Sequence, residues 1–245
     1  MILTVIPCHL DDCIRAEKLL DHILNLNKKK QHESGVLLVF APSVPQENRD
    51  KLRITAEVTF KHVVTASPRI EPNDDKRQIV ASMLRSAALN VSSSFRVPWL
   101  WLEPDCTPLK SSWLKDISTA YESQPMKYMG GHLKYGEAIA LNRIAVYPND
   151  ATNDFKESQA ADIPFEFFVV NKSSKSRLFQ EAKIVETSDI GVVRPDALIV
   201  HKDKTGVLHD EILKRERDAK PQTKTASTKT TNSAVNKTST TQPAV

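Results

Sequence analysis

The 245-residue sequence has no apolar run that approaches the roughly 20 residues a membrane-spanning helix needs. Its N-terminus, MILTVIPCHLDD, has no basic segment ahead of the apolar one, so it favours a first strand over a secretory signal. The three cysteines require no disulfide partner. These absences predict a cytoplasmic protein without a membrane span.

Glycine is scarce, with six residues, and several common ligand-binding motifs are missing. The absence of G-x-G-x-x-G, G-x-x-x-x-G-K-[ST] and H-E-x-x-H argues against dinucleotide redox enzymes, P-loop hydrolases and zinc proteases. The segment PCHLDDC also lacks the glycine-rich loop that sugar nucleotidyltransferases usually carry after their first strand. A ligand site in this chain must therefore be built from other side chains.

Acidic residues are missing from residues 220–245, which contain four lysines and many Thr and Ser. This segment cannot bury enough apolar surface to offset its ordering entropy, so we predict a disordered tail. A weak tether to DNA or RNA is the alternative. Residues 1–219, the predicted single folded domain, contain 30 Lys and Arg against 30 Asp and Glu. Their neutrality argues against a long nucleic-acid contact, although a local basic groove would escape this count.

The first hundred residues alternate between apolar runs and helical patterns. Four short apolar runs are predicted strands, at residues 2–7, 36–41, 60–65 and 98–103. Helical spacing of apolar residues separates them, most clearly at 14–26 and after a cap at Asp74 or Asp75. Continuous apolar strands joined by helices predict a parallel sheet with helices on both faces. The loops at the carboxyl ends of these strands should then share one ligand-binding edge.

The second half has a different pattern. Residues 127–134 and 138–147 predict two antiparallel strands, following a helix at 112–123. A polar loop through Asp154 and a helix at 162–171 should come next. Strands are expected at 182–186 and 196–201. The fold class is therefore α/β, with a mostly parallel central sheet, flanking helices and antiparallel strands in the second half.

The fourth predicted strand runs directly into Glu103-Pro104-Asp105. The two carboxylates emerge together at the ligand edge, and Pro104 stiffens the turn between them. Carboxylates and diphosphate oxygens form an all-oxygen environment that suits Mg²⁺ or Mn²⁺. An ordinary turn seldom ends so apolar a strand with two acidic residues, so this segment predicts a divalent metal site.

Glu103-x-Asp105 after an apolar strand, followed by Cys106-Thr107-Pro108 and Trp113, resembles the Asp-x-Asp motif of GT-A-fold, nucleotide-sugar-dependent glycosyltransferases. The segment WLEPDCTPLKSSWL looks most like small bacteriophage and viral members, some of them associated with modification of DNA bases. The resemblance implies a GT-A-like (Rossmann-like) sheet, with a nucleotide-binding half at 1–110 and an acceptor half at 111–219. Glu at the first acidic position departs from the common motif.

The resemblance also implies roles for individual residues, and each role is an expectation. Asp105 and His201 would bind Mn²⁺ or Mg²⁺, with Glu103 assisting at the ion or at a sugar hydroxyl. The remaining expected nucleotide-sugar contacts are Pro7, His9, Asp11, Asp12, Lys76, Arg77, Gly131, His132 and Lys204.

Asp162 and Glu166 are the expected catalytic carboxylates. Asp162 precedes Pro164 and should begin a helix, which places Glu166 one turn later on the same face. In inverting GT-A enzymes, a carboxylate at a comparable helix start removes the acceptor proton. The resemblance therefore implies a sugar transferase with Asp162 as base, whose acceptor is a modified DNA base or, as the second choice, a protein or glycan. A viral enzyme would work in the host cytoplasm.

Each of these residues also has a purely structural interpretation. Asp162 is equally well explained as a helix cap, and His201 as an ordinary strand-end histidine. Lys76 and Arg77 are typical of a solvated helix face, and Gly130-Gly131 of a bulge. The cysteines with His9 match no common zinc spacing.

The overall alternative is a non-catalytic sugar- or nucleotide-binding module that keeps the fold. Trp99 and Trp101 are predicted core residues, whereas Trp113 is the tryptophan expected to contact ligand.

Overall fold

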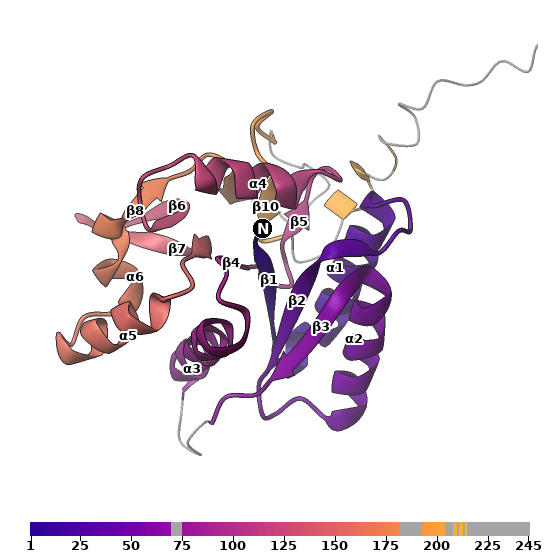
Figure 1. The fold of residues 1–245 in the computed structure, drawn as a ribbon, viewed down its shortest axis with the longest axis horizontal. Helices are drawn as coiled ribbons and strands as arrows, with labels where there is room; N and C mark the ends of the chain where they lie inside the picture. The colour runs from indigo at the N-terminus through magenta and orange to yellow at the C-terminus, as the bar shows by residue number, and fades with distance from the viewer. Residues whose placement is uncertain (70–74, 182–192, 204–207, 210, 213, 215–245) are drawn as a thin grey trace, which may run out of the picture.

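The computed structural model describes residues 1–69, 75–181, 193–203, 208, 209, 211, 212 and 214. At its centre lies a seven-stranded sheet with strand order β3-β2-β1-β4-β7-β6-β8, and helices lie on both sides of it (Figure 1). The predicted α/β class with a mostly parallel sheet and antiparallel additions is confirmed.

Four parallel strands form the N-terminal half of this sheet: β1 (Leu3–Cys8), β2 (His32–Phe40), β3 (Phe60–Ala66) and β4 (Trp99–Trp101). On one side lie α1 (Cys13–Leu26) and α2 (Gln46–Thr59), and on the other lies α3 (Lys76–Asn90) (Figure 1). Trp99 and Trp101 are fully buried, as predicted. Because all four strands run the same way, their carboxyl ends share one edge, as the sequence predicted.

The second half extends the sheet with antiparallel strands. After α4 (Trp113–Glu122), β6 (Tyr128–Tyr135) and β7 (Ala138–Tyr147) form the predicted antiparallel pair, and β7 runs antiparallel to β4. The short β8 (Ser173–Lys175) is parallel to β6. Within β6 the register shifts between Gly130 and His132. A Cβ on Gly130 would lie 2.6 Å from the Cβ of Ala145, so packing alone requires this glycine.

A second, three-stranded sheet consists of β5 (Thr107–Pro108), β10 (Ile199–His201) and β9 (Phe179–Glu181). The sequence predicted the last strand but not its place in a separate sheet. Strand β10 lies antiparallel to β5, and the register pairs Val200 with Thr107. This pairing brings residues near position 200 beside the turn that follows β4.

Two predictions for the second half are wrong. The expected polar loop through Asp154 is a helix, α5 (Ala151–Ala160). Asp154 is only 2% exposed, because the Tyr128 hydroxyl donates to it at 2.6 Å and Lys127 and Lys172 pair with it at 3.1 and 2.5 Å. These three donors compensate the buried charge. Asp154 can therefore be buried in a helix, although the sequence suggested an exposed loop residue.

The predicted helix at 162–171 is the second error. The chain instead forms a short α6 (Phe165–Phe168) and a 3-10 turn, η3 (Val170–Lys172). Two further short elements flank the helices, η1 (Leu10–Asp12) and the π-turn η2 (Val91–Phe95). The predicted strand at 182–186 and the tail at 220–245 lie outside the described residues. Within the described part of the chain, no helix combines the length and apolarity needed to cross a membrane.

A buried pair of histidines links α1 to the C-terminal segment. His22 is 2% exposed, its Nε2 lies 2.7 Å from the Pro108 carbonyl oxygen, and its ring stacks on His209 with centroids 4.2 Å apart. Burial, together with the neighbouring His209, lowers the pKa of His22 to about 4, although the hydrogen bond to Pro108 opposes this shift. The folded protein therefore holds His22 neutral at neutral pH.

We predict that this histidine makes the folded state sensitive to mild acid. The unfolded chain takes up a proton near pH 6.5 while the folded chain resists it, so stability is present above pH 6.5 and is lost as the pH falls toward 4. Between pH 7 and 4.5, His22→Gln should lose about 2 kcal/mol less free energy of unfolding than the parent. Urea unfolding at both pH values measures this difference. The exposed His62→Gln variant is the control, and equal losses in both variants would contradict the assignment.

Candidate active site

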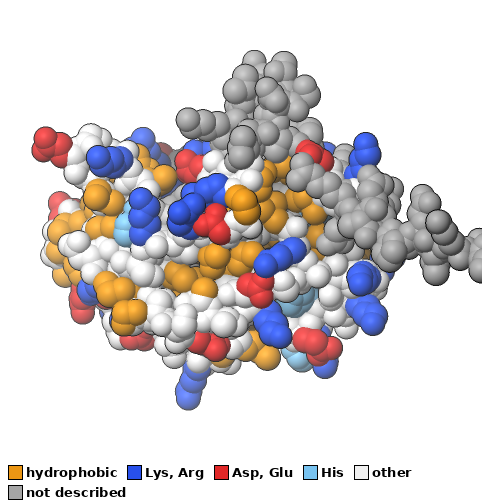
Figure 2. All heavy atoms as spheres, turned by 90° about the horizontal axis from the view of Figure 1, so that it is seen from above, with side chains coloured by type: hydrophobic (Ala, Val, Ile, Leu, Met, Phe, Trp, Pro, Cys, Tyr) orange, Lys and Arg blue, Asp and Glu red, His pale blue; other side chains and the backbone are white. Residues whose placement is uncertain are grey.

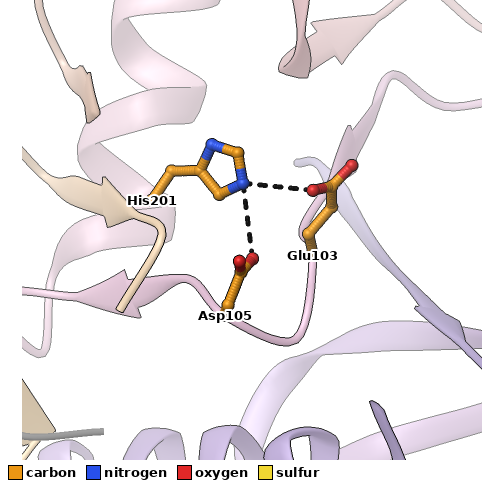
Figure 3. Close-up of side chains that lie close together, drawn as sticks. All are labelled: Glu103, Asp105 and His201. Atoms are coloured by element: carbon orange, nitrogen blue, oxygen red, sulfur yellow. Dashed lines mark hydrogen bonds and ion pairs between the residues drawn. The ribbon is translucent and has the colours of Figure 1, made fainter. Parts of the chain in front are cut away.

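Two carboxylates follow the end of β4 and point toward the same region (Figure 3). The backbone N–H of Cys106 donates to the Glu103 carbonyl at 2.9 Å, which closes the turn around Pro104. The side chains of Glu103 and Asp105 are 24% and 18% exposed, so both are partly withdrawn from water. The turn thus holds two acidic groups close together, as the sequence predicted.

His201 reaches these carboxylates from β10. The Asp203 backbone N–H donates to the Asp105 carbonyl at 2.9 Å, and the Thr107 hydroxyl donates to the Asp203 carboxylate at 2.8 Å. Together with the pairing of β10 and β5, these bonds fix the two segments against each other. The position of His201 is therefore set by backbone pairing and by a buried side-chain hydrogen bond.

The three side chains form one compact group (Figure 3). The His201 Nε2 lies 3.1 Å from a Glu103 oxygen and 3.3 Å from an Asp105 oxygen. One ligand atom from each residue lies within 4.8 Å of the others, and no other cluster of potential metal ligands occurs among the described residues. Of the residues expected to form the metal site, all three are brought together.

Charge explains how the group is stabilised. Burial disfavours the imidazolium, but the hydrogen bonds and negative charges of Asp105 and Glu103 outweigh it and raise the pKa of His201 to about 9. Burial would likewise raise the pKa of Asp105, but His201 and the nearby Arg15 lower it below its ordinary value. The imidazolium thus supplies the positive charge that two neighbouring carboxylates need.

The other ring nitrogen of His201 faces Glu181. Nδ1 is buried without a hydrogen-bond partner, and the Glu181 carboxylate lies 3.8 Å away. Glu181 itself pairs with Lys202 at 3.0 Å and accepts a hydrogen bond from Asn142 at 3.3 Å. Strands β9 and β10 place Glu181 directly opposite His201 in register. A carboxylate at this position matches the outer-shell partner that metal-ligating histidines usually have.

These donors fit a divalent cation. Two carboxylates suit Mg²⁺ or Mn²⁺, and the imidazole shifts the preference toward Mn²⁺ because Mg²⁺ favours oxygen ligands. The His201 Nε2 would have to release its proton to bind. The positive charge already present between the carboxylates shows that the surroundings accommodate a cation.

Glu103 and His201 of this group line a cavity of about 990 Å³. Helix α3, the hairpin of β6 and β7, and the segment from α5 to α6 contribute the other walls. Cationic and acidic side chains both line it: Arg77, Arg85, Arg143, Lys202, Glu103, Asp162, Glu166 and Glu181. The volume is large enough for a drug-sized ligand, so the cavity can hold more than the ion.

Asp162 lines this cavity, but it does not begin a helix as predicted. Its backbone has a φ of 53°, and its N–H donates to the Gln159 carbonyl while the next N–H, of Ile163, donates to Ser158. This is the Schellman ending of α5, whose left-handed position usually holds glycine. Asp162 is exposed, and a carboxylate is not needed for this helix ending, which its backbone alone forms.

Glu166 lines the same cavity, but its carboxylate forms an ion pair. Its carboxylate lies 3.1 Å from the Nε of Arg143 and is partly buried. The ion pair neutralises Glu166, whereas Asp162 has no ion-pair partner among the described residues. Of the two expected catalytic carboxylates, Asp162 is therefore better placed to accept a proton.

The residues expected around the nucleoside lie along and after β1. Pro7 is buried within the strand and does not line the cavity, and His9 is half-buried just beyond it. Asp11 and Asp12 form η1, where Asp12 pairs with Arg15. Because Arg15 also lowers the pKa of Asp105, this turn lies close to the carboxylate pair. Arg15 escaped the sequence analysis, and its only signal was its spacing of three residues from Asp12.

The cationic start of α3 has a structural explanation. Asp75 caps the helix: its carboxylate accepts hydrogen bonds from the backbone N–H groups of Arg77 and Gln78, and its own backbone N–H donates to the Gln78 side-chain oxygen. This acidic cap offsets the unfavourable position of cations there. Lys76 is the first residue of α3, and Arg77 lines the cavity. Lys204 lies outside the described residues.

Several other residues considered in the sequence analysis lie away from the larger cavity. Gly131 and His132 line a second cavity and do not contact the larger one. Trp113, expected to contact ligand, is only 1% exposed, because its ring packs into the core near His32. The three cysteines are buried and free, and none belongs to the group of Glu103, Asp105 and His201, the cluster of potential metal ligands in the described residues.

Comparison with known proteins identifies the fold. No protein-family model matches this chain, and no curated protein does. The galactosyltransferase LgtC, solved with donor and acceptor sugar analogues, is 9% identical over 87% of this chain and 96% of its own, with a TM-score of 0.53. The bifunctional glycosyltransferase WbbM is 10% identical over 82% of this chain and 45% of its own, with a TM-score of 0.51. These likenesses confirm the GT-A-like fold.

We predict that the carboxylate–histidine group binds Mn²⁺. Asp105→Asn and His201→Gln should each weaken Mn²⁺ binding by at least about 100-fold. Mutation of residues that only contact the ligands already lowers metal affinity by about 10- to 100-fold. Titration calorimetry of the full chain measures the affinity. Asp116→Asn is the control, because Asp116 pairs with Lys110 at 2.6 Å and lines neither cavity. Equal affinity in parent and Asp105→Asn would exclude this site.

Proposed function

We propose that this protein is a metal-dependent glycosyltransferase that moves a sugar from a nucleotide-sugar donor to an acceptor hydroxyl. One observation carries the proposal. Glu103, Asp105 and His201 converge at the carboxyl end of β4, and two of them, Glu103 and His201, line a cavity that Asp162 also lines. The GT-A-like fold supports the same assignment by analogy, because known glycosyltransferases share it.

The chain's own residues divide the work of binding the donor. Asp105 and His201, assisted by Glu103, would hold Mn²⁺ or Mg²⁺, and such an ion supplies positive charge that stabilises a departing diphosphate. Lys202 and Arg77 line the same cavity and add donors for phosphate oxygens. Asp11 and Asp12 would contact the nucleoside from the turn after β1.

Asp162 would act on the acceptor. Its carboxylate faces the cavity without an ion-pair partner among the described residues, so it can accept the proton of the attacking hydroxyl and orient its oxygen. Arg143 holds Glu166 as an ion pair, which favours a role for Glu166 in shaping the acceptor site.

The backbone of Asp162 allows this role to be separated from a structural one. Asp162→Gly should lower kcat by about 10²- to 10⁴-fold, the usual worth of a general base. Its free energy of unfolding should stay equal or rise by about 1 kcal/mol, because glycine relieves the left-handed conformation. Turnover of sugar nucleotides and urea unfolding give the two quantities.

Glu166→Gln is the comparison variant from the same cavity. If Glu166→Gln costs more in kcat than Asp162→Gly, the base is Glu166. If Asp162→Gly keeps full activity, Asp162 serves only as the end of α5.

A binding module with the same fold is the alternative, and Glu at the first acidic position is the observation that favours it. Nucleoside diphosphates titrated in the presence of Mn²⁺ test the shared part of both ideas. Failure of the parent to bind them would overturn both. Release of nucleoside diphosphate from a sugar nucleotide separates the two, because a binding module releases none.

For the acceptor, we propose first a hydroxymethylated or otherwise modified DNA base, supported by the resemblance of residues 101–114 to small phage enzymes. A protein or glycan hydroxyl is the second choice. The face shown in Figure 2 carries Lys and Arg interspersed with Asp and Glu, and no continuous basic stripe is visible among its described residues. A DNA acceptor would accordingly be held over a short segment.

A further inference from the structure

A second cavity, of about 430 Å³, lies beside the first. The bulged part of β6, the end of β8 and the segment leading into β9 form its walls. Leu133, Asn142 and Glu181 line both cavities. Glu181 therefore lies between the second cavity and His201, whose Nδ1 it faces at 3.8 Å. We call this second cavity the basic recess.

Positive charge predominates in the basic recess. Lys175, Arg177 and Arg194 line it, and among the lining residues that the structure describes, Glu181 is the only carboxylate. Lys202 already pairs with Glu181 at 3.0 Å. Asp196 pairs with Arg177 at 2.8 Å and with Arg194 at 3.8 Å, so it balances part of their charge. No ion pair engages Lys175 within the described residues, which leaves excess positive charge at the recess.

Arg194, one of the donors in the recess, is held in place before any ligand arrives. The Arg194 guanidinium donates to the carbonyls of Arg177 and Phe179 at 2.6 and 3.1 Å, while its Nε is buried without a hydrogen-bond acceptor. Its backbone N–H donates to Gln180 at 2.8 Å. The Nε has no acceptor nearer than the Asp196 oxygen of its ion pair, at 3.8 Å, and a guanidinium fixed in this way suits an oxyanion.

The pKa of His132 is affected by the same positive charge. Burial lowers the pKa of His132, and the nearby charge of Lys175 lowers it further. Its Nε2 lies 2.9 Å from the Ser173 hydroxyl, so the imidazole is fixed beside Lys175. Gly131 lines the recess without a side chain, which lets a ligand approach the backbone there.

From this geometry we infer that the basic recess binds a single phosphate group carried by the acceptor. That the phosphate belongs to the acceptor rests on the proposed function, whereas phosphate binding itself does not. A phosphate here would lie on the far side of Glu181 from His201, so the rest of the acceptor could extend into the larger cavity. Three cations and a glycine-lined wall match the charge and size of one phosphate.

The first experiment uses inorganic phosphate and the full chain, without divalent cation or donor. Amide chemical shifts of Gly131, His132 and Lys175 should move in a saturable way as phosphate is added at constant ionic strength. Lys175→Gln should weaken this binding by about threefold to tenfold, as the loss of one charged contact at a surface site implies. Lys134→Gln, an exposed lysine of the same strand β6 that lines neither cavity, should leave it unchanged.

Two results would overturn the inference. One is a response that chloride reproduces at equal ionic strength, and the other is equal weakening by Lys175→Gln and Lys134→Gln. Phosphate binding without sugar-nucleotide turnover would leave the recess in place and contradict the proposed function. Sugar-nucleotide turnover without phosphate binding would support the proposed function and overturn the basic recess as a phosphate site. The two failures can therefore be told apart.

The second experiment distinguishes the sources of the phosphate. A short single-stranded oligodeoxynucleotide and a phosphorylated monosaccharide are titrated over a range of salt concentrations. A slope of log affinity against log salt near −1 supports one bound phosphate, whichever probe binds. A slope of about −4 or steeper for the oligonucleotide means six or so phosphate contacts and would overturn a single-phosphate site.

Discussion

The site depends on the pairing of two very short strands, β5 and β10. Their backbone hydrogen bonds, together with the contact from Asp203 to the Asp105 carbonyl, bring a histidine to a carboxylate 96 residues earlier in the chain. Without this pairing, Glu103 and Asp105 would face each other across a tight turn without the imidazolium of His201, which carries most of the charge that balances them. The small second sheet thus determines whether the end of β4 is a binding site.

Electrostatic balance explains why the larger cavity can combine ligands of opposite charge. At one wall, His201 between two carboxylates marks a place suited to a cation. Lys202, Arg77 and the basic recess supply positive charge nearby, and Glu181 separates the recess from His201. Asp162 lines the same cavity, and its carboxylate has no ion-pair partner in the described structure. Such an arrangement suits a reaction in which negative charge leaves one side while a proton is removed at the other.

The sequence predicted the strands well where apolar residues run without interruption, as in β1, β2 and β4. It failed where tertiary contacts compensate a polar residue. Asp154 suggested a loop, yet Tyr128, Lys127 and Lys172 allow it to lie inside a helix. Asp162 suggested a helix start, because an acidic residue shortly before a proline is typical of the first turn of a helix. In the structure it is instead the left-handed residue that ends α5.

By itself, the sequence determined the parallel sheet, the common edge of its strands and the carboxylate pair after β4, since each follows from local patterns of apolar and acidic residues. Only the tertiary structure decided which distant residues join that pair. Glu181 and the cations of the basic recess carry no local signal, and Arg15 carries only its spacing from Asp12, because their roles arise from strand register and packing between segments far apart in the chain.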